Sequence, residues 1–180
     1  MRALLVLSLV ATLLSAGSGR AEPPPLVFPL IEHYGGVAPL PEASYPPQKG
    51  AKIVFDITTD SPPEAVNRGL ESVARYLNLN AHAGHAPSDA RLTVVLHGGA
   101  TKCALHDAAY RAHTRADKNP NLPLLRELKK HGVELVVCGQ SLARNQFAQT
   151  EVAEPLSVAV SAMTVNVAKQ LEGYAYLAIH

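Results

Sequence analysis

The sequence has no tryptophan, only two cysteines and few aromatic residues. Aromatic residues make up 5% of its 180 residues, so stacking surfaces for nucleic-acid bases are not expected. Two cysteines exclude a disulfide-rich scaffold and a four-cysteine zinc site within one chain. The formal net charge is only +1, which gives no reason to expect a nucleic-acid partner. Phosphate-binding loops, dinucleotide fingerprints, Gly-x-Ser-x-Gly elbows and Cys-x-x-Cys motifs are also missing.

The N-terminal segment has the features of a secretory signal peptide. Arg2 supplies a positive charge, and an apolar run follows over residues 3–16. A Gly-Arg-Ala sequence before Glu22 matches a small-x-small cleavage site. The run is shorter than the roughly 20 residues that span a bilayer. We therefore expect residues 1–21 to be removed, the mature protein to be periplasmic, and no stable membrane insertion after cleavage. A retained membrane anchor is the alternative.

Residues 22–50 form a proline-rich N-terminal arm, which contains eight of the 14 prolines. Proline fixes φ and lacks a backbone donor, so this stretch is neither a regular helix nor a central strand. The arm nevertheless carries a cluster of apolar side chains at Leu26, Val27, Phe28, Leu30, Ile31 and Tyr34. We interpret it as an extended arm that lies on its own domain or on a neighbouring subunit. A flexible spacer is the alternative.

From residue 51 onward, short apolar runs alternate with helical patterns. Strands are expected over residues 53–57, 92–96, 133–137, 156–160 and 174–179. Helices are expected from Ser61 through Leu77 and over residues 104–118, 122–131, 141–149 and 164–171. Ser61 is the expected first helix cap, and residues 78–89 read as a polar turn. The alternation predicts one α/β domain over residues 51–180, a three-layer α/β/α fold with a mostly parallel sheet of about five strands.

Ligands gather at the carboxyl ends of the strands in such sheets. Two of the expected strand ends carry His97-Gly98 and Cys138-Gly139-Gln140-Ser141, and we predict that these residues form a site. Cys138 directly precedes an expected helix, whose free N–H groups favour a thiolate over a thiol. Gly139 would let the backbone approach a ligand, and Gln140 and Ser141 offer N–H groups to an anionic sulfur. A thiolate there could attack, carry a persulfide or bind a soft metal, whereas a buried packing cysteine is the alternative.

Several short motifs occur in a characteristic order along the chain. They are Leu96-His97-Gly98, Asn119-Pro120-Asn121, Leu128 with Gly132-Val133, Cys138-Gly139-Gln140-Ser141, Ser161-Ala162-Met163-Thr164 and Gly173-Tyr174-Ala175-Tyr176. With these motifs, the chain from about residue 52 to residue 180 resembles the DsrE/DsrF-like family of small α/β proteins. The resemblance implies a role in sulfur oxidation or sulfur relay, with a persulfide on Cys138. It also implies a homo-oligomer, a trimer or hexamer, and a protein that donates or accepts sulfur.

The second cysteine and the histidines raise further alternatives. Cys103 could pair with Cys138 as a redox partner if their Cα atoms lie within roughly 7 Å, since exported proteins meet an oxidising compartment. Two independent thiols are the alternative. His82 with His85, and Cys103 with His106, have ligand-like spacings. The preferred interpretation is nevertheless solvated histidines, with no metal site and no cofactor.

Two aspartates flank the end of the first expected strand. Without visible partners, Asp56 and Asp60 are weak evidence for catalysis, and Asp60 is expected to be a turn residue beside Ser61.

The leading hypothesis is an exported DsrE-like protein that handles sulfur as a persulfide carrier through Cys138. The alternatives are a non-catalytic homo-oligomeric binding module for a metal or small molecule, and a purely structural partner subunit. The sequence leaves open whether the protein turns over a substrate as an enzyme.

Overall fold

The computed structural model describes residues 23–180, so the expected signal peptide lies outside the described residues. The strands are β1 (Ala51–Ile57), β2 (Ala90–Leu96), β3 (Glu134–Cys138), β4 (Ser157–Ala159) and β5 (Ala175–Ile179). The α-helices are α1 (Arg68–His82), α2 (Asp107–Thr114), α3 (Leu122–Lys130), α4 (Gly139–Arg144) and α5 (Ala162–Leu171). Within residues 23–180, no helix has the length and apolar character needed to cross a bilayer.

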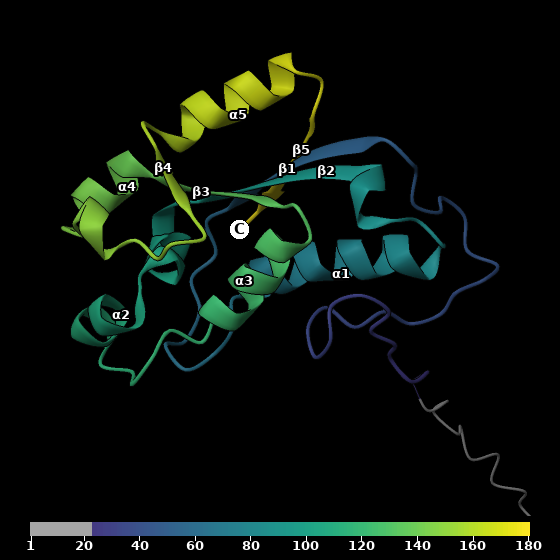
Figure 1. The fold of residues 1–180 in the computed structure, drawn as a ribbon, viewed down its shortest axis with the longest axis horizontal. Coiled ribbons are helices and arrows are strands. Elements are labelled where there is room, and N and C mark those ends of the chain that lie inside the picture. Colours follow the sequence, from purple (N-terminus) through teal and green to yellow (C-terminus); the bar gives the residue numbers. More distant parts are fainter. Residues whose placement is uncertain (1–22) are drawn as a thin grey trace, which may run out of the picture.

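The strands form one sheet in the order β4-β3-β2-β1-β5, and each neighbouring pair is parallel. Helix α5 covers one face of the sheet, while α1 and α3 lie on the opposite face (Figure 1). Parallel sheets need this cover because both of their faces are apolar. The structure confirms the predicted three-layer α/β/α fold.

The two faces of the sheet differ in what they bury. Because side chains alternate along a strand, Ile53 and Ile57 of β1 point into the main core beneath α1 and α3. Val54 points the other way and packs with Val95 and Cys138 below α5. The same alternation places Asp56, His97 and Tyr176 on the α5 face. Each lies two residues after a residue of that face, namely Val54, Val95 and Tyr174.

The first helix begins later than the sequence predicts. It starts at Arg68, and its cap is Asn67, whose side chain accepts a 2.8 Å hydrogen bond from the N–H of Gly69. The expected cap at Ser61 is wrong. The N–H of Asn67 donates to the side chain of Asn121 at 2.7 Å, so a buried contact between distant residues fixes the helix start.

The end of the first helix also differs from the prediction. The expected polar turn from residue 78 is instead the last turn of α1, because Asn78 and Asn80 are buried and hydrogen-bonded. Helix α2 is shorter than expected over residues 104–118. It begins after His106, whose ring accepts a hydrogen bond from the N–H of Ala109.

The proline-rich arm packs against α1 of its own domain. The side chain of Asn78 accepts hydrogen bonds from the N–H groups of Leu30 and Ile31, at 3.0 and 2.8 Å. It donates to the carbonyl oxygens of Tyr34 and Gly35, at 2.9 and 3.1 Å. Ile31 is fully buried in the main core. The arm therefore does not behave as a free spacer over the residues that the structure describes.

Candidate functional site

A pocket of about 570 Å³ opens on the α5 side of the sheet, at the carboxyl ends of β1, β2 and β3. The side chains that can carry charge or exchange protons in it are Asp56, His97, Cys138, Ser141, Arg144 and Tyr176. Apolar side chains of the β4–α5 segment, Val160 and Met163 among them, complete the wall. The pocket lies where ligands bind in open parallel sheets.

Four of the six residues predicted for the site line this pocket, namely His97, Cys138, Gln140 and Ser141. The other two shape its backbone. Gly98 has φ +56° and donates its N–H to the hydroxyl of Ser141 at 3.3 Å, which ties the end of β2 to α4. A Cβ atom on Gly139 would lie 2.8 Å from the carbonyl oxygen of Ala159, so this close approach of β4 to α4 requires glycine.

Cys138 is the last residue of β3 and caps α4, which begins two residues earlier than predicted. Its side chain is buried at the base of the pocket, and the residue is only 3% exposed. Burial alone would raise the pKa of the thiol. The backbone N–H groups of Ala162, Ser141 and Gln140 and the Ser141 hydroxyl outweigh burial and lower this pKa below its ordinary value of 9.0.

A buried carboxylate supports the histidine of the pocket. Asp56 is 4% exposed, and its Oδ1 lies 2.8 Å from Nε2 of His97. Nε2 is not aligned on Oδ1 as a hydrogen-bond donor, so we treat the contact as an ion pair. The hydroxyl of Tyr176 donates to the other carboxylate oxygen at 2.6 Å. Each carboxylate oxygen of Asp56 thus has a neighbour from a different strand.

These contacts shift both pKa values in the direction that favours an ion pair. Burial would raise the pKa of Asp56, but the contacts with His97, Tyr176 and Asn166 lower it to about 2. The carboxylate of Asp56 raises the pKa of His97, against the opposing effect of burial, and the charge of Cys138 raises it further. The contacts in the pocket therefore shift the pKa values of all three groups toward their charged forms, thiolate, imidazolium and carboxylate.

Sequence reasoning undervalued Asp56 and missed Arg144 and Tyr176. The signal for Asp56 was its place in an otherwise apolar strand, two residues after Val54, which points it to the same face as His97. Its partners could not be read from the sequence because they come from other strands. Arg144 comes from α4 and carries no signal of this kind.

Cys103 and Asp60 lie outside the pocket. Cys103 is fully buried in the main core on the opposite face of the sheet, and burial raises its pKa to about 12. Both cysteines are free, so the structure contains no disulfide between them. Asp60 accepts a 2.7 Å hydrogen bond from the N–H of Ser61 and forms an ion pair with Lys102, and it precedes the turn at residues 63–64.

The histidines with ligand-like spacings do not converge on a metal position. In residues 23–180, no three or more His, Cys, Asp or Glu side chains are placed to hold a metal ion. His106 caps α2, and the ring of His85 lies 3.3 Å from the amide oxygen of Asn80. His113 lies 3.1 Å from Glu151.

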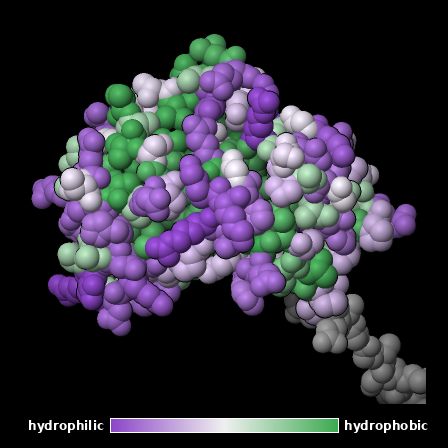
Figure 2. All heavy atoms as spheres, in the orientation of Figure 1, coloured by the Kyte–Doolittle hydropathy of each residue, from purple (hydrophilic) through white to green (hydrophobic). Residues whose placement is uncertain are grey.

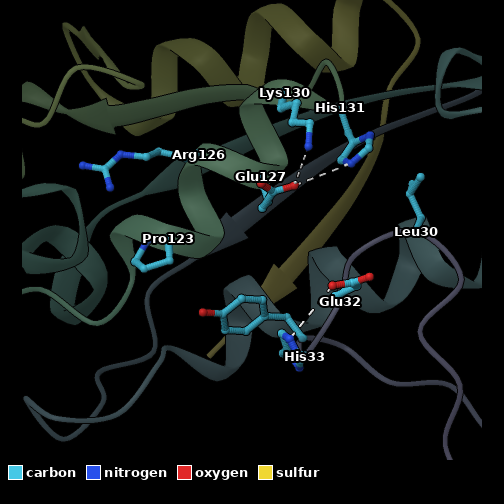
Figure 3. Close-up of a pocket in the computed structure, with 9 residues that line it drawn as sticks. Leu30, Glu32, His33, Pro123, Arg126, Glu127, Lys130 and His131 are labelled. Carbon is cyan, nitrogen blue, oxygen red and sulfur yellow. Dashed lines mark hydrogen bonds and ion pairs between the residues drawn. The ribbon is translucent and has the colours of Figure 1, made fainter.

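A second hollow of about 650 Å³ lies between the arm and α3 (Figure 3). It contains no cysteine, and most of its charged groups pair within each wall, whereas Arg126 has no ion pair within residues 23–180. On α3, Glu127 lies 3.4 Å from Lys130 and 3.8 Å from His131, while Glu32 and His33 pair on the arm at 4.0 Å. With no thiol nucleophile and with most of its charges paired, this hollow is a weaker candidate than the pocket at Cys138.

The model of the DsrE/DsrF-like family matches residues 52–179 of the sequence. The chain belongs to the DsrE/DsrF-like family. This confirms the resemblance seen in its motifs, and the family is associated with sulfur relay. The solved structure of a protein of unknown function from Methanobacterium thermoautotrophicum is similar in fold, with a TM-score of 0.52 and 22% identity. The similarity covers 72% of this DsrE-like chain and 99% of that one. No curated protein matches the sequence.

Proposed function

We propose that this DsrE-like protein carries sulfane sulfur as a persulfide on Cys138. The observation that supports this most is the set of hydrogen-bond donors around the sulfur, which lowers the pKa of a buried thiol. The thiolate is the nucleophile in sulfur chemistry, and a structural cysteine does not need such donors. Cys103 provides the contrast within the same chain, since its burial raises the pKa to about 12.

The transfer needs no external oxidant. The Cys138 thiolate attacks the outer sulfur of a donor persulfide, a new S–S bond forms, the donor S–S bond breaks, and the donor leaves as a thiol. The reverse step passes the sulfur to an acceptor thiol. Because the pocket holds one cysteine, the acceptor thiol comes from another molecule.

The depth of the pocket restricts what can reach the sulfur. With Cys138 only 3% exposed, a small thiol or a flexible chain that ends in a thiol can enter, whereas a flat protein surface cannot. The exposed side chains of Val160 and Met163 beside the opening offer an apolar contact for such a donor or acceptor.

Intact mass after exposure to glutathione persulfide tests the proposal. We expect wild-type protein and Cys103→Ser to gain the mass of one sulfur atom, and Cys138→Ser to gain none. Alkylation rates against pH should give the thiol left in Cys103→Ser a pKa below 9.0. If Cys103→Ser takes up no sulfur although it is alkylated normally, the carrier role is wrong and a binding module becomes the leading function.

A further inference from the structure

Sulfur transfer to Cys138 produces a charge that the pocket has to neutralise. When the donor S–S bond breaks, the donor departs as a thiolate. An unpaired anion in a buried site is costly, so a proton donor at this point would lower the barrier. A thiol that leaves as a weaker base departs faster, which makes the need for a proton largest for alkyl thiols.

His97 is placed to supply this proton. Strands β2 and β3 are paired so that Leu96 lies opposite Val137. Extending this register by one residue places His97 opposite Cys138. Neighbouring strands lie roughly 5 Å apart, and both side chains line the pocket. The backbone N–H of His97 also donates to the carbonyl oxygen of Ile57 at 3.1 Å, which holds the end of β2 against β1.

The carboxylate of Asp56 positions the imidazole ring of His97. Oδ1 of Asp56 lies 2.8 Å from Nε2, and the Tyr176 hydroxyl holds the other carboxylate oxygen at 2.6 Å. Since the Asp56 carboxylate lies beside Nε2, we assign Nδ1 as the ring nitrogen that exchanges a proton with a bound molecule. A nucleophile, a neighbouring base and a third group that orients the base are the parts of an activated-nucleophile site.

We propose that His97 is a catalytic residue that protonates the departing thiol and recovers the proton from the new persulfide, with Asp56 and Tyr176 as positioning residues. The proposal rests on the carrier function of Cys138. It assigns the chemistry to a Cys–His–Asp arrangement contributed by three neighbouring strands.

The step balances in atoms and charge. The Cys138 thiolate attacks the outer sulfur of R–S–SH, the donor S–S bond breaks, and R–S⁻ takes the proton of the His97 imidazolium to leave as R–SH. The new Cys138–S–SH then gives its proton to the neutral imidazole of His97. The products are the Cys138 persulfide anion, R–SH and the His97 imidazolium, with no net oxidation or reduction.

The charged and titratable groups that face His97 set the pH dependence. Asp56 on β1 lies beside its ring, and Cys138 on β3, Arg144 on α4 and Tyr176 on β5 line the same pocket. The transfer requires the thiolate, so its rate falls at low pH as Cys138 is protonated. It also requires the imidazolium, so the rate with an alkyl leaving group falls as the pH rises through the pKa of His97, which lies above the ordinary 6.5.

The decisive experiment compares leaving groups in the Cys103→Ser background. Cys138 attacks two disulfide probes, glutathione disulfide with an alkyl thiol leaving group and dithiobis(nitrobenzoate) with a weakly basic aromatic one. With each rate divided by the thiolate fraction measured by alkylation, we expect His97→Gln to lose about 100-fold or more with the alkyl probe, the usual size of general acid catalysis, and little with the aromatic probe. His113→Gln is the matched control, because His113 forms a similar pair with Glu151 on the surface and should leave both rates unchanged.

A second variant keeps the test informative if His97→Gln folds poorly. Asp56→Asn should shift the high-pH fall of the alkyl-probe rate to lower pH, because His97 loses the carboxylate that raises its pKa. Equal losses with both probes in His97→Gln, or an unmoved pH profile in Asp56→Asn, would overturn the proposal. The disulfide probes react with Cys138 without any persulfide. These results therefore test the role of His97 even if glutathione persulfide leaves no sulfur on wild-type protein and the carrier function is wrong.

Discussion

The buried carboxylate of Asp56 is the residue on which the electrostatics of the site depend. A carboxylate in the interior is costly unless it is paired and hydrogen-bonded, and Asp56 has both His97 and Tyr176 as partners. These contacts outweigh burial and lower its pKa from 3.8 to about 2. That shift corresponds to about 2 kcal/mol of folding free energy.

The stability of the protein should therefore depend on pH through this pair. Asp56 has a lowered pKa in the folded state, so its contribution is present above pH 3.8 and is lost as the pH falls through about 2. His97 has a raised pKa, so its contribution is present below pH 6.5 and is lost as the pH rises through the folded value. We expect Asp56→Asn to lower the free energy of unfolding most between about pH 4 and pH 6.5, by about 2 kcal/mol.

Urea unfolding at a series of pH values measures this difference. The exposed Asp117 provides the control, since Asp117→Asn should change the free energy of unfolding little at any pH. A constant difference between wild type and Asp56→Asn from pH 3 to pH 9 would contradict the ion pair.

Residues of the site could be predicted from the sequence to different degrees. Cys138 was found because a cysteine between an apolar run and a glycine predicts a strand end followed by a helix. His97 was found for the same reason, beside two glycines. Tyr176 could not be assigned a role, because its partner Asp56 lies 120 residues away and only the sheet order brings them together.

Among the elements, strands were predicted well and helix ends poorly. The buried strands are continuous apolar runs, and their position needs only local information. The ends of α1 depend on buried asparagines whose partners are distant, Asn67 with Asn121 at one end and Asn78 with the arm at the other. Local pattern assigns such residues to turns, because unpaired asparagine favours turns and caps.

Asn78 is predicted to be the residue that fastens the arm to α1. Asn78→Ala leaves the N–H groups of Leu30 and Ile31 without their acceptor, so we expect a loss of at least about 2 kcal/mol in the free energy of unfolding. Limited proteolysis should then cut within residues 23–50 much faster than in wild type. Ser72→Ala removes a hydrogen bond within the same helix and is the control. Unchanged cleavage of the arm in Asn78→Ala would show that packing of Ile31 alone holds it.

On the scale of the whole molecule, the α5 side of the sheet is thinly covered. Met163, Val167 and Leu171 follow one another at four-residue spacing along α5 and are 74%, 56% and 85% exposed. Figure 2 shows hydrophobic atoms at the top of the molecule, where α5 lies. On the edge strand β5, the side chain of Tyr176 is also exposed on this side. Exposed apolar patches of this kind mark interfaces, which supports the homo-oligomer that the family resemblance implies.

We therefore predict a trimer or hexamer in solution, whose interface contains Met163, Val167 and Leu171 of α5. Light scattering at micromolar concentration should give the mass of the oligomer for wild type and a smaller mass for Val167→Asp. Leu40→Asp, which changes an equally apolar and exposed residue on the arm, should leave the mass unchanged. A wild-type monomer would contradict the prediction.

The place of β5 in the sheet has a consequence for the order of events during synthesis. Strand β5 pairs with β1, and only then does the Tyr176 hydroxyl reach Asp56. Pairings between such distant segments form slowly, and this one cannot form before residues 175–179 have left the ribosome. A nascent chain thus exposes Cys138 without the finished pocket around it, and its thiol is no more reactive than that of an ordinary peptide. The proposed sulfur loading is in this way confined to molecules in which β5 has paired with β1.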